Sequence, residues 1–447
     1  MPGPPDEPAA RTSVTVSPYS CLLCVAALLA PLFGLAAEFD LDLDELNEIS
    51  PRPGTVIDSG NFERYAHLFD RDFAKFVEGG FTSIEVDPPL SFKPHPAFVF
   101  ATRQFRGQAR LSDNPGLLVD FTQGLPFPGR LEIDDPKAGT KTAWNMRYAY
   151  TGDSGKIPEM HWQLRDWRKD TVDFEMLFEA RTMRFMYRHV QQPVPFIKKN
   201  PQDAYGAFLL NAIDAGSYDG TQALVFANRD ESRDINGWVY IPQLQRTQSL
   251  ASFSTEESMF GTDILPTDFL IYSGRIVDMT WQYLGSTFML LPMYRHDRIE
   301  PADRKARKYD YWHVDFHGRA GCFPKIQWQL RPVVILEGKA VDPSAPVARR
   351  VFYLDAQTHV APLWKVYKEN GALWKIIVSG FAHPNSHVAE NNETGAPVLT
   401  VFSTIDTQTN RCTTIQLLTV INVDDVGPED FDTGMMRSGG GRSFRRR

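Results

Sequence analysis

The sequence has few cysteines and none of the short motifs that mark common enzyme chemistries. Only four of its 447 residues are cysteine. It contains no nucleophile elbow, phosphate-binding glycine loop, zinc-protease helix or dinucleotide fingerprint in a fitting context. These absences argue against a hydrolase, a nucleotide-dependent enzyme and a metalloprotease. We therefore expect a protein that is not an enzyme and that needs no cofactor.

An excess of positive charge is also lacking. The formal net charge is −8 at pH 7, which argues against a nucleic-acid-binding surface. Basic residues cluster only near the end of the chain, where Arg437, Arg442 and residues 445–447 flank a glycine run. Because this stretch has no apolar periodicity, we expect residues 426–447 to form a disordered basic tail. Such a tail is either solvated or in contact with anionic lipid head groups.

Long hydrophobic runs are scarce, and the one candidate lies near the start. Residues 21–37 are apolar and end in Gly34-Leu35-Ala36-Ala37, just before Glu38. This run is shorter than the about 20 residues of a transmembrane helix, and its small residues fit a signal-peptidase site. We expect residues 1–37 to be a signal peptide, with a buried helix as the alternative. The mature protein would then be periplasmic.

The remaining cysteines allow one crosslink. Cys21 and Cys24 would be removed with the leader, which leaves Cys322 and Cys412 in an oxidising compartment. The sequence does not show whether their Cα atoms lie within about 7 Å of each other. A long-range disulfide and two buried thiols both remain open.

Residues 38–100 are expected to form an N-terminal arm with an amphipathic helix. Asn61–Glu78 carries aromatic residues at intervals of three or four, and Gly79-Gly80 would end the helix. The aromatic residues are Phe62, Tyr65, Phe69, Phe73 and Phe76. We expect the helix to pack on the core or to plug the mouth of a sheet.

In residues 101–425, short stretches of alternating apolar and polar residues are separated by turn residues, as in β-strands. We therefore expect one mainly β domain. Asn370-Gly371 gives the strongest hairpin signal, between Tyr367 and Leu373. The stretches 398–404 and 413–422 are expected to form a closing hairpin. Successive hairpins imply an antiparallel meander in which sequence neighbours pair.

The stretch 237–292 joins two expected strands through a polar loop and a short helix. Residues 238–241 alternate as in a strand, and Pro242 ends the pairing. Thr267 is expected to cap the helix, with Asp268 in its first turn. In the returning strand Met279, Trp281 and Tyr283 share one apolar face.

A metal site was considered at His313, Asp315 and His317. Strand alternation would place these two imidazoles and the carboxylate on one face, where they could converge on an ion. The alternative is a solvated polar face opposite Trp312 and Phe316. We favour the solvated face and expect no metal.

The order of several short motifs resembles the LolA/LolB-like periplasmic proteins. It is most similar to domain-of-unknown-function family 1329, often labelled outer membrane lipoprotein-sorting proteins. The matching residues are 238–242 (WVYIP), Arg246, 261–263 (GTD), Asp268-Phe269, 124–128 (GLPFP), Trp144-Asn145, Arg147-Tyr148, 350–355 (RVFYLD) and 373–375 (LWK). The resemblance covers residues 111–381. It implies a curved antiparallel sheet, or half-barrel, with a few helices on its concave side and an apolar ligand inside.

The resemblance favours a ligand cavity over an ordinary aromatic core. We expect the ligand to be bound by Trp238, Tyr240, Phe260, Phe269, Met279, Trp281, Tyr283, Phe352 and Trp364. The polar stretch 252–274 is expected to act as a gate. The function would be a carrier of a lipid, a lipoprotein acyl chain or another amphiphile in the Gram-negative envelope. It would exchange this cargo with an inner-membrane transporter or an outer-membrane acceptor. The alternative is a non-enzymatic accessory protein that docks on a transport complex by a sheet edge.

Overall fold

The computed structural model describes Gly3 and residues 39–113, 116–200, 202–234, 236–250, 257–269, 271–299 and 313–436. The rest of the expected signal peptide and the terminal arginine cluster lie outside the described residues. No helix within the described ranges is both long and apolar enough to cross a membrane.

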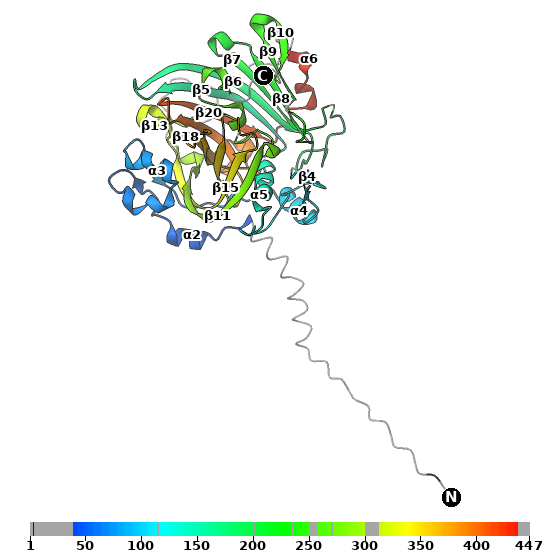
Figure 1. The fold of residues 1–447 in the computed structure, drawn as a ribbon, viewed down its shortest axis with the longest axis horizontal. Coiled ribbons are helices and arrows are strands. Elements are labelled where there is room, and N and C mark those ends of the chain that lie inside the picture. Colours follow the sequence, from blue (N-terminus) through cyan, green and yellow to red (C-terminus); the bar gives the residue numbers. More distant parts are fainter. Residues whose placement is uncertain are drawn as a thin grey trace.

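One large, open sheet dominates the molecule (Figure 1). Its first half consists of β5 (Ser154–Asp166), β6 (Thr171–Arg184), β7 (Ala204–Asp214), β8 (Gln222–Asn228), β9 (Asn236–Ile241) and β10 (Arg246–Ser249). Its second half consists of β11 (Met279–Leu291), β15 (Gln327–Ala340), β16 (Arg349–Asp355), β17 (Leu363–Tyr367), β18 (Leu373–Ala382), β19 (Val398–Asp406) and β20 (Arg411–Ile421). Each half is an antiparallel meander, and β20 pairs with β5 to join them. The predicted mainly β class and meander are confirmed.

Two short strands make the sheet mixed. β2 (Ile84–Val86) runs parallel to the start of β15 and pairs on its other side with β1 (Val56–Ile57). β12 (Met293–Tyr294) runs parallel to the end of β18. The expected N-terminal arm thus contributes strands to the edge of the sheet.

The predicted hairpins form where turn residues allow them. Gly371 has a φ of +78°, a conformation that glycine adopts without a steric penalty. Tyr367 therefore pairs with Leu373 across the turn. The closing hairpin of β19 and β20 is also present.

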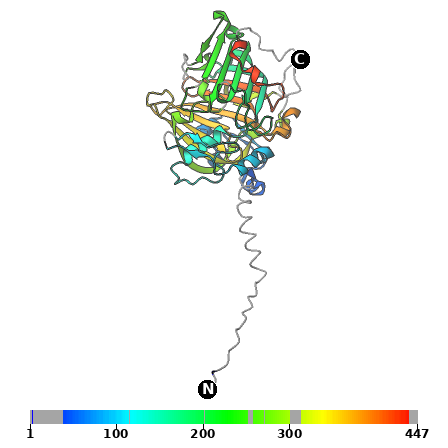
Figure 2. The same cartoon turned by 90° about the vertical axis from the view of Figure 1, so that its right-hand side faces the viewer.

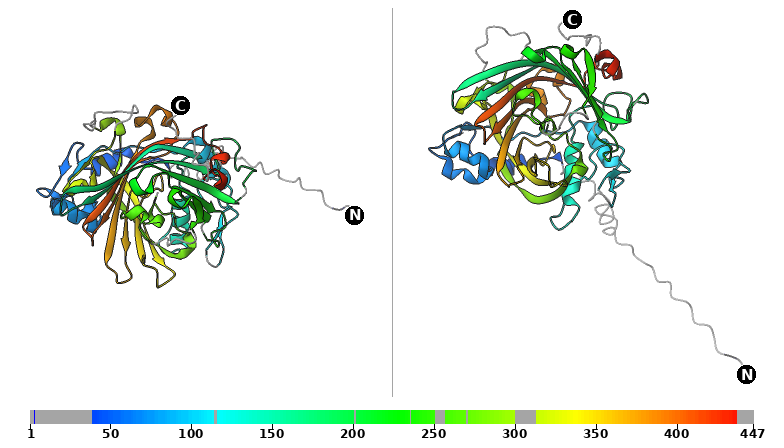
Figure 3. Two further views of the ribbon diagram at one scale, coloured as in Figure 1. Left: turned by 90° about the horizontal axis from the view of Figure 1, so that it is seen from above. Right: turned by 45° about the horizontal axis from the view of Figure 1, so that its top comes forward.

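The sheet curves, and its inner side holds α5 (Ala138–Arg147) together with residues 257–269 and 271–278 (Figure 3). Gly139 lets α5 approach β11 closely, because a Cβ there would overlap the backbone carbonyl of Trp281. We call the buried apolar residues on this side the inner-face cluster. It includes Trp162, Phe178, Phe352 and Trp364.

The N-terminal arm packs on the opposite face of the second half of the sheet. It contains α2 (Leu43–Ile49), α3 (Arg71–Glu78) and α4 (Pro96–Gln104). Alternate residues of the same strands, such as Val351 and Tyr353, face this outer cluster, whereas Phe352 faces inward. Both faces of this half are therefore covered.

The predicted single helix at 61–78 is wrong. Two 3-10 turns at Phe62–Arg64 and Ala66–Leu68 precede α3. Phe69 and Asp70 are extended, because the Asp70 carboxylate caps α3 by accepting from the Asp72 and Phe73 amides at 3.0 Å. The aromatic stripe still packs on the core, where Phe73 stacks on Trp328 at 4.9 Å.

The end of the described chain is ordered, contrary to our expectation for residues 426–436. Val426, Phe431 and Met436 are buried against β6, β7 and β8. Short α6 (Thr433–Met436) lies beside these strands (Figure 2). These three apolar side chains can be buried, which explains the ordered packing. The prediction of disorder rested on the arginines that follow, from Arg437 onward.

Candidate ligand-binding site

Residues 257–269 and 271–278, here together called the inner segment, lie between β10 and β11 and fill part of the inner side of the sheet. The segment forms 3-10 turns at Met259–Gly261, Pro266–Asp268 and Ile276–Asp278, and none of its described residues belongs to a strand. Ile264, Leu265 and Phe269 are buried in the inner-face cluster. Side-chain contacts therefore hold the segment in place, together with a few hydrogen bonds.

Two aromatic residues of the inner segment pack on aromatic residues of the sheet. The Phe269 ring lies 5.7 Å from Trp162 of β5 and 5.4 Å from Phe208 of β7. Phe260 lies 5.0 Å from Phe178 of β6 and 5.9 Å from Trp162. Both residues were predicted to bind ligand, and here they cover the sheet.

The backbone of the inner segment is strained at two positions. Phe260 has a φ of +52° and Ile271 has a φ of +85°. Positive φ is unusual for a bulky residue and exceptional for a β-branched one, with a cost on the order of 1–3 kcal/mol each. This strain weakens the packed position of the segment relative to a released one.

Buried ionic contacts join the inner segment to the sheet. Arg350 of β16 donates to the Asp268 carboxylate at 2.8 Å and to the Thr267 hydroxyl at 2.7 Å. Lys375 of β18 donates to the backbone carbonyl of Asp263. Arg350 is only 4% exposed and Lys375 only 1%. The predicted helix with Thr267 as its cap is wrong, because Thr267 and Asp268 bind this guanidinium instead.

Asp263 is held from β20 as well. Its amide donates to the Thr413 hydroxyl at 2.9 Å, and that hydroxyl donates to its carboxylate at 3.1 Å. Burial raises the pKa of the Asp263 carboxyl, although Arg411 and Lys375 oppose the shift. Burial also lowers the pKa of Lys375, against the attraction of Asp268, Asp263 and Asp406. Burial is the largest cause of both shifts.

Several polar atoms on the inner face have no hydrogen-bond partner among the described residues. They are Trp162 Nε1, Trp364 Nε1, Thr404 Oγ1 and Asp268 Oδ2. An unmade hydrogen bond at a buried group costs about 1–3 kcal/mol. The packed inner segment therefore leaves the inner face incompletely satisfied.

Four further predicted residues lie together in the inner-face cluster. Trp281 packs 6.0 Å from Phe352, which stacks 6.3 Å from Trp364. Met279 is buried beside Arg350, with 4.0 Å between its sulfur and a guanidinium nitrogen. Tyr283, on the same face of β11, lines a cavity of about 380 Å³ with Trp281 and Ile133. Met279 and Trp281 thus face inward, and the half-buried Tyr283 lies on their side of β11, where it pairs with Leu336 of the inner-face cluster. Ligand binding by this face stays a prediction.

The structure does not bring Trp238 and Tyr240 to this cluster. Trp238 pairs with Leu224 and packs 5.9 Å from the Phe226 ring, in the cluster on the opposite side of the first half of the sheet. Tyr240 lies on the same side. Alternation separates the two faces of a strand, but it does not say which face points inward.

A second cavity of about 310 Å³ lies at the end of the inner segment that leads into β11, lined by Arg147, Tyr205, Gly274 and Arg275 among others. Arg147 of α5 donates to the Gly274 carbonyl and, at 2.9 Å, to the Tyr205 hydroxyl. The Glu231 carboxylate accepts from the Ile276 amide. These contacts anchor the end of the segment that leads into β11. The expected gate included Ser252–Glu256, which lie outside the described residues.

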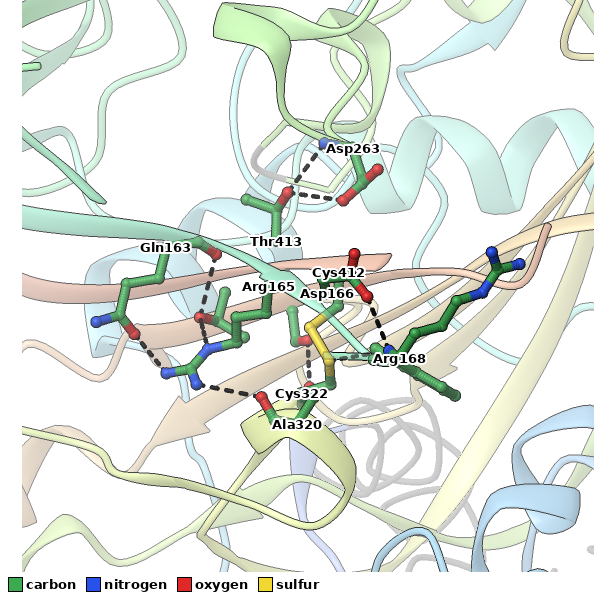
Figure 4. Close-up of a disulfide and its surroundings, with 12 residues drawn as sticks. Gln163, Arg165, Asp166, Arg168, Asp263, Ala320, Cys322, Cys412 and Thr413 are labelled. Atoms are coloured by element: carbon green, nitrogen blue, oxygen red, sulfur yellow. Dashed lines mark hydrogen bonds between the residues drawn. A yellow bond between two sulfur atoms is a disulfide. The ribbon is translucent and has the colours of Figure 1, made fainter. Parts of the chain in front are cut away.

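The disulfide pairs Cys322 with Cys412, with 5.9 Å between their Cα atoms. Figure 4 shows Cys412 and its neighbour Thr413 on opposite sides of β20. Cys412 reaches Cys322 on the outer side, whereas Thr413 reaches Asp263. The crosslink thus fixes β20 where it holds the inner segment.

The residues considered for metal binding do not converge. Of the expected strand, only Phe316–His317 is paired, and Trp312 lies outside the described residues. His313 faces Glu159 at 3.9 Å, His317 lies 3.4 Å from the Thr82 hydroxyl, and Asp315 is exposed. The part of the chain that the structure describes has no group of three or more His, Cys, Asp and Glu residues placed to hold a metal ion.

The sequence analysis did not predict the ionic contacts, although the residues that form them belong to the motifs on which the family resemblance rests. Asp263 belongs to the GTD motif, Arg350 to RVFYLD and Lys375 to LWK. The structure brings all three motifs to one place inside the sheet. Charged residues at inward positions of otherwise apolar strands were the available signal.

An open, curved sheet filled from its inner side by a helix and a loop is the fold that the resemblance implied. The chain belongs to the family described as protein of unknown function (DUF1329), whose model matches residues 56–436. A crystal structure of a DUF1329 family protein from Desulfovibrio piger ATCC 29098 aligns at 15% identity and a TM-score of 0.46, over 68% of this chain and 99% of that chain.

Two other solved structures are similar. A putative outer membrane lipoprotein-sorting protein domain from Vibrio parahaemolyticus aligns at 13% identity and a TM-score of 0.46, over 68% of this chain and 100% of that chain. A LolA superfamily protein from Nitrosomonas europaea aligns at 10% identity and a TM-score of 0.38, over 65% of this chain and 94% of that chain. No curated protein matches the chain.

Proposed function

We propose that this protein binds an amphiphile on the inner face of its sheet, in the place that the inner segment occupies in this structure. The observation that carries the proposal is the way Phe260 and Phe269 cover Trp162 and Phe178 without any strand pairing. Apolar burial yields about 25 cal/mol per Å², so an acyl chain could replace these side chains without a covalent step. The backbone strain at Phe260 and Ile271 and the unpaired Asp268 Oδ2 favour release of the segment.

The setting would be the periplasm of a Gram-negative cell, where a carrier moves lipids or lipoprotein acyl chains between two membranes. The expected signal peptide and the disulfide support an exported, oxidised protein. The printed name of the Vibrio structure, a lipoprotein-sorting protein domain, is compatible with such a role.

Mass spectrometry of lipids extracted from the purified protein tests the proposal, followed by titration with a fluorescent fatty acid. We expect co-purified amphiphile or saturable binding. Absence of both would remove the carrier function.

A second candidate is an accessory protein that docks on an envelope transport complex. Leu284 and Phe288 are exposed on β11, which pairs with β15 alone among the described strands. Such an edge can accept a strand from a partner. Capture of a transport complex by the wild-type protein, lost on Phe288→Lys, combined with no lipid binding, would favour this candidate.

A further inference from the structure

Arg350 and Lys375 lie in one row across three neighbouring strands of the inner face. Both residues pair with Val366 of β17, Arg350 from β16 and Lys375 from β18. Since neighbouring strands are about 4.8 Å apart, the two cations project from positions about 10 Å apart. Asp406 and Arg411 continue the same row onto β19 and β20.

The next row on the same face is apolar. Two residues further along the strands, Phe352 pairs with Trp364, and Trp364 pairs with Ile377. Residues two apart on a strand are separated by about 7 Å, so the cations lie directly beside an aromatic surface. A charged row beside an aromatic row matches the two ends of an amphiphile.

The inner segment covers both rows and places oxygen acceptors against the two cations. Its carboxylate at Asp268 and hydroxyl at Thr267 bind Arg350, and its Asp263 carbonyl binds Lys375. The hydrogen bonds of Arg350 to oxygen, among the described residues, all go to this segment. If the segment leaves the sheet, Arg350 loses these partners, and Lys375 keeps only the attraction of Asp406, its neighbour in the row. A ligand whose apolar chain again excludes water from this face would leave the cations buried, and a buried cation needs an anionic partner.

We propose that the ligand is an anionic amphiphile whose carboxylate or phosphate binds Arg350 and Lys375 in place of the inner segment, while its apolar chain lies over Phe352 and Trp364. The inner segment is then an internal mimic of the ligand. This inference rests on the proposed function, and it adds the charge of the ligand and the residues that bind it. The unpaired Asp268 Oδ2 supports it, because release of the segment exposes this atom to water, where it can accept hydrogen bonds.

The test compares cis-parinaric acid with its methyl ester, two fluorescent probes that share a chain and differ in charge at neutral pH. We expect the wild-type protein to bind the acid at least about tenfold more tightly than the ester, a difference of about 1.4 kcal/mol. Arg350→Gln and Lys375→Gln should each lower the ratio of acid affinity to ester affinity, because each removes a cation that binds the carboxylate, whereas the loosened inner segment affects both probes alike. Equal binding of acid and ester by the wild type would overturn the anionic ligand and leave the carrier function standing. Binding of neither probe, together with no co-purified amphiphile, would remove the carrier function itself.

The variant Asp268→Asn provides a second binding test, which does not depend on the folding of the Arg350 variant. Removing the internal anion should raise the affinity for the acid by about tenfold or more, because the segment competes less well. The matched control is Asp425→Asn, which removes an exposed carboxylate paired with Lys156 on the surface. Unchanged or weaker acid binding by Asp268→Asn would contradict the proposal. Inorganic phosphate at millimolar concentration should not displace the acid; if it does, the site binds free anions and the amphiphile is wrong.

Discussion

Arg350 and Asp268 form a buried ion pair inside the curved sheet, with 2.8 Å between the guanidinium Nε and the carboxylate Oδ1. The pair joins a strand of the sheet to the inner segment, whose described residues form no strand. Whether the segment stays packed therefore depends on a contact between two charges that would be better solvated apart. The stability of the protein and the opening of its candidate site should be coupled at this pair.

The first prediction is a double-mutant cycle at this pair. Arg350→Leu or Asp268→Leu alone should destabilise the protein by about 3–5 kcal/mol, because each leaves a buried charge without its partner. The double variant should be less destabilised than the sum of the two, since no unpaired charge remains. Chemical denaturation of the four proteins measures the coupling energy. Strict additivity would show that the pair does not hold the segment.

The second prediction separates the inner-face cluster from the rest of the core. Phe269 and Phe76 are both 8% exposed, Phe269 in the inner segment and Phe76 in α3 on the outer face. Each change to Ala should cost about 3–5 kcal/mol if its surroundings stay folded. Phe269→Ala should in addition raise the binding of cis-parinaric acid, because it weakens the cover over Trp162. Phe76→Ala should leave binding unchanged, and equal effects of the two variants on binding would count against a movable cover.

The third prediction concerns pH. Burial lowers the pKa of His359 from its usual value of 6.5 to about 4, although Asp355 opposes the shift. The unfolded chain therefore takes up a proton below about pH 6.5 while the folded protein does not, so stability falls as the pH drops toward 4. Each pKa unit corresponds to about 1.4 kcal/mol, and complete loss would amount to about 3 kcal/mol.

His359→Asn isolates this contribution. His359 has a φ of +60°, a conformation that Asn tolerates better than most residues. The free energy of unfolding should depend less steeply on pH between 6.5 and 4 in the variant than in the wild type. Identical slopes would show that His359 is not held neutral in the folded protein.

The fourth prediction concerns the disulfide. Cys322 and Cys412 are 90 residues apart, so their crosslink restricts the unfolded chain strongly. Replacing both with Ala should lower the free energy of unfolding by about 2–5 kcal/mol. The same change should speed hydrogen exchange at the Asp263 amide, which Thr413 holds from the next position of β20. A melting temperature unaffected by the replacement or by a reductant would contradict this role.

The strands were predictable because burial leaves a period of two in the sequence. Met279, Trp281 and Tyr283 alternate with Thr280 and Gln282, and the structure buries or half-buries the first set and exposes the second. The same pattern could not assign Trp238 and Tyr240 to the correct side, because period two is identical for either face. Only the curvature of the whole sheet distinguishes inside from outside.

The helix at 61–78 was predicted wrongly and the ionic contacts were not predicted at all, for different reasons. Aromatic spacing persists through the extended residues Phe69 and Asp70, so it hid the break that Asp70 creates as a capping residue. Arg350 and Lys375 were ordinary charged residues in the sequence, and only their partners Asp268 and Asp263, over 80 positions away, make burial possible. A charge at an inward strand position was the one local signal, and it did not identify the distant partner.

Hydrogen–deuterium exchange of residues 257–278, with and without saturating cis-parinaric acid, tests most directly whether the inner segment gives way to an amphiphile. The account predicts that exchange in this segment becomes at least about tenfold faster when the acid binds, while β16, β17 and β18 exchange at the same rate or more slowly. Saturable binding with unchanged or slower exchange of the segment would contradict it, because the ligand would then lie somewhere other than the face that this segment covers.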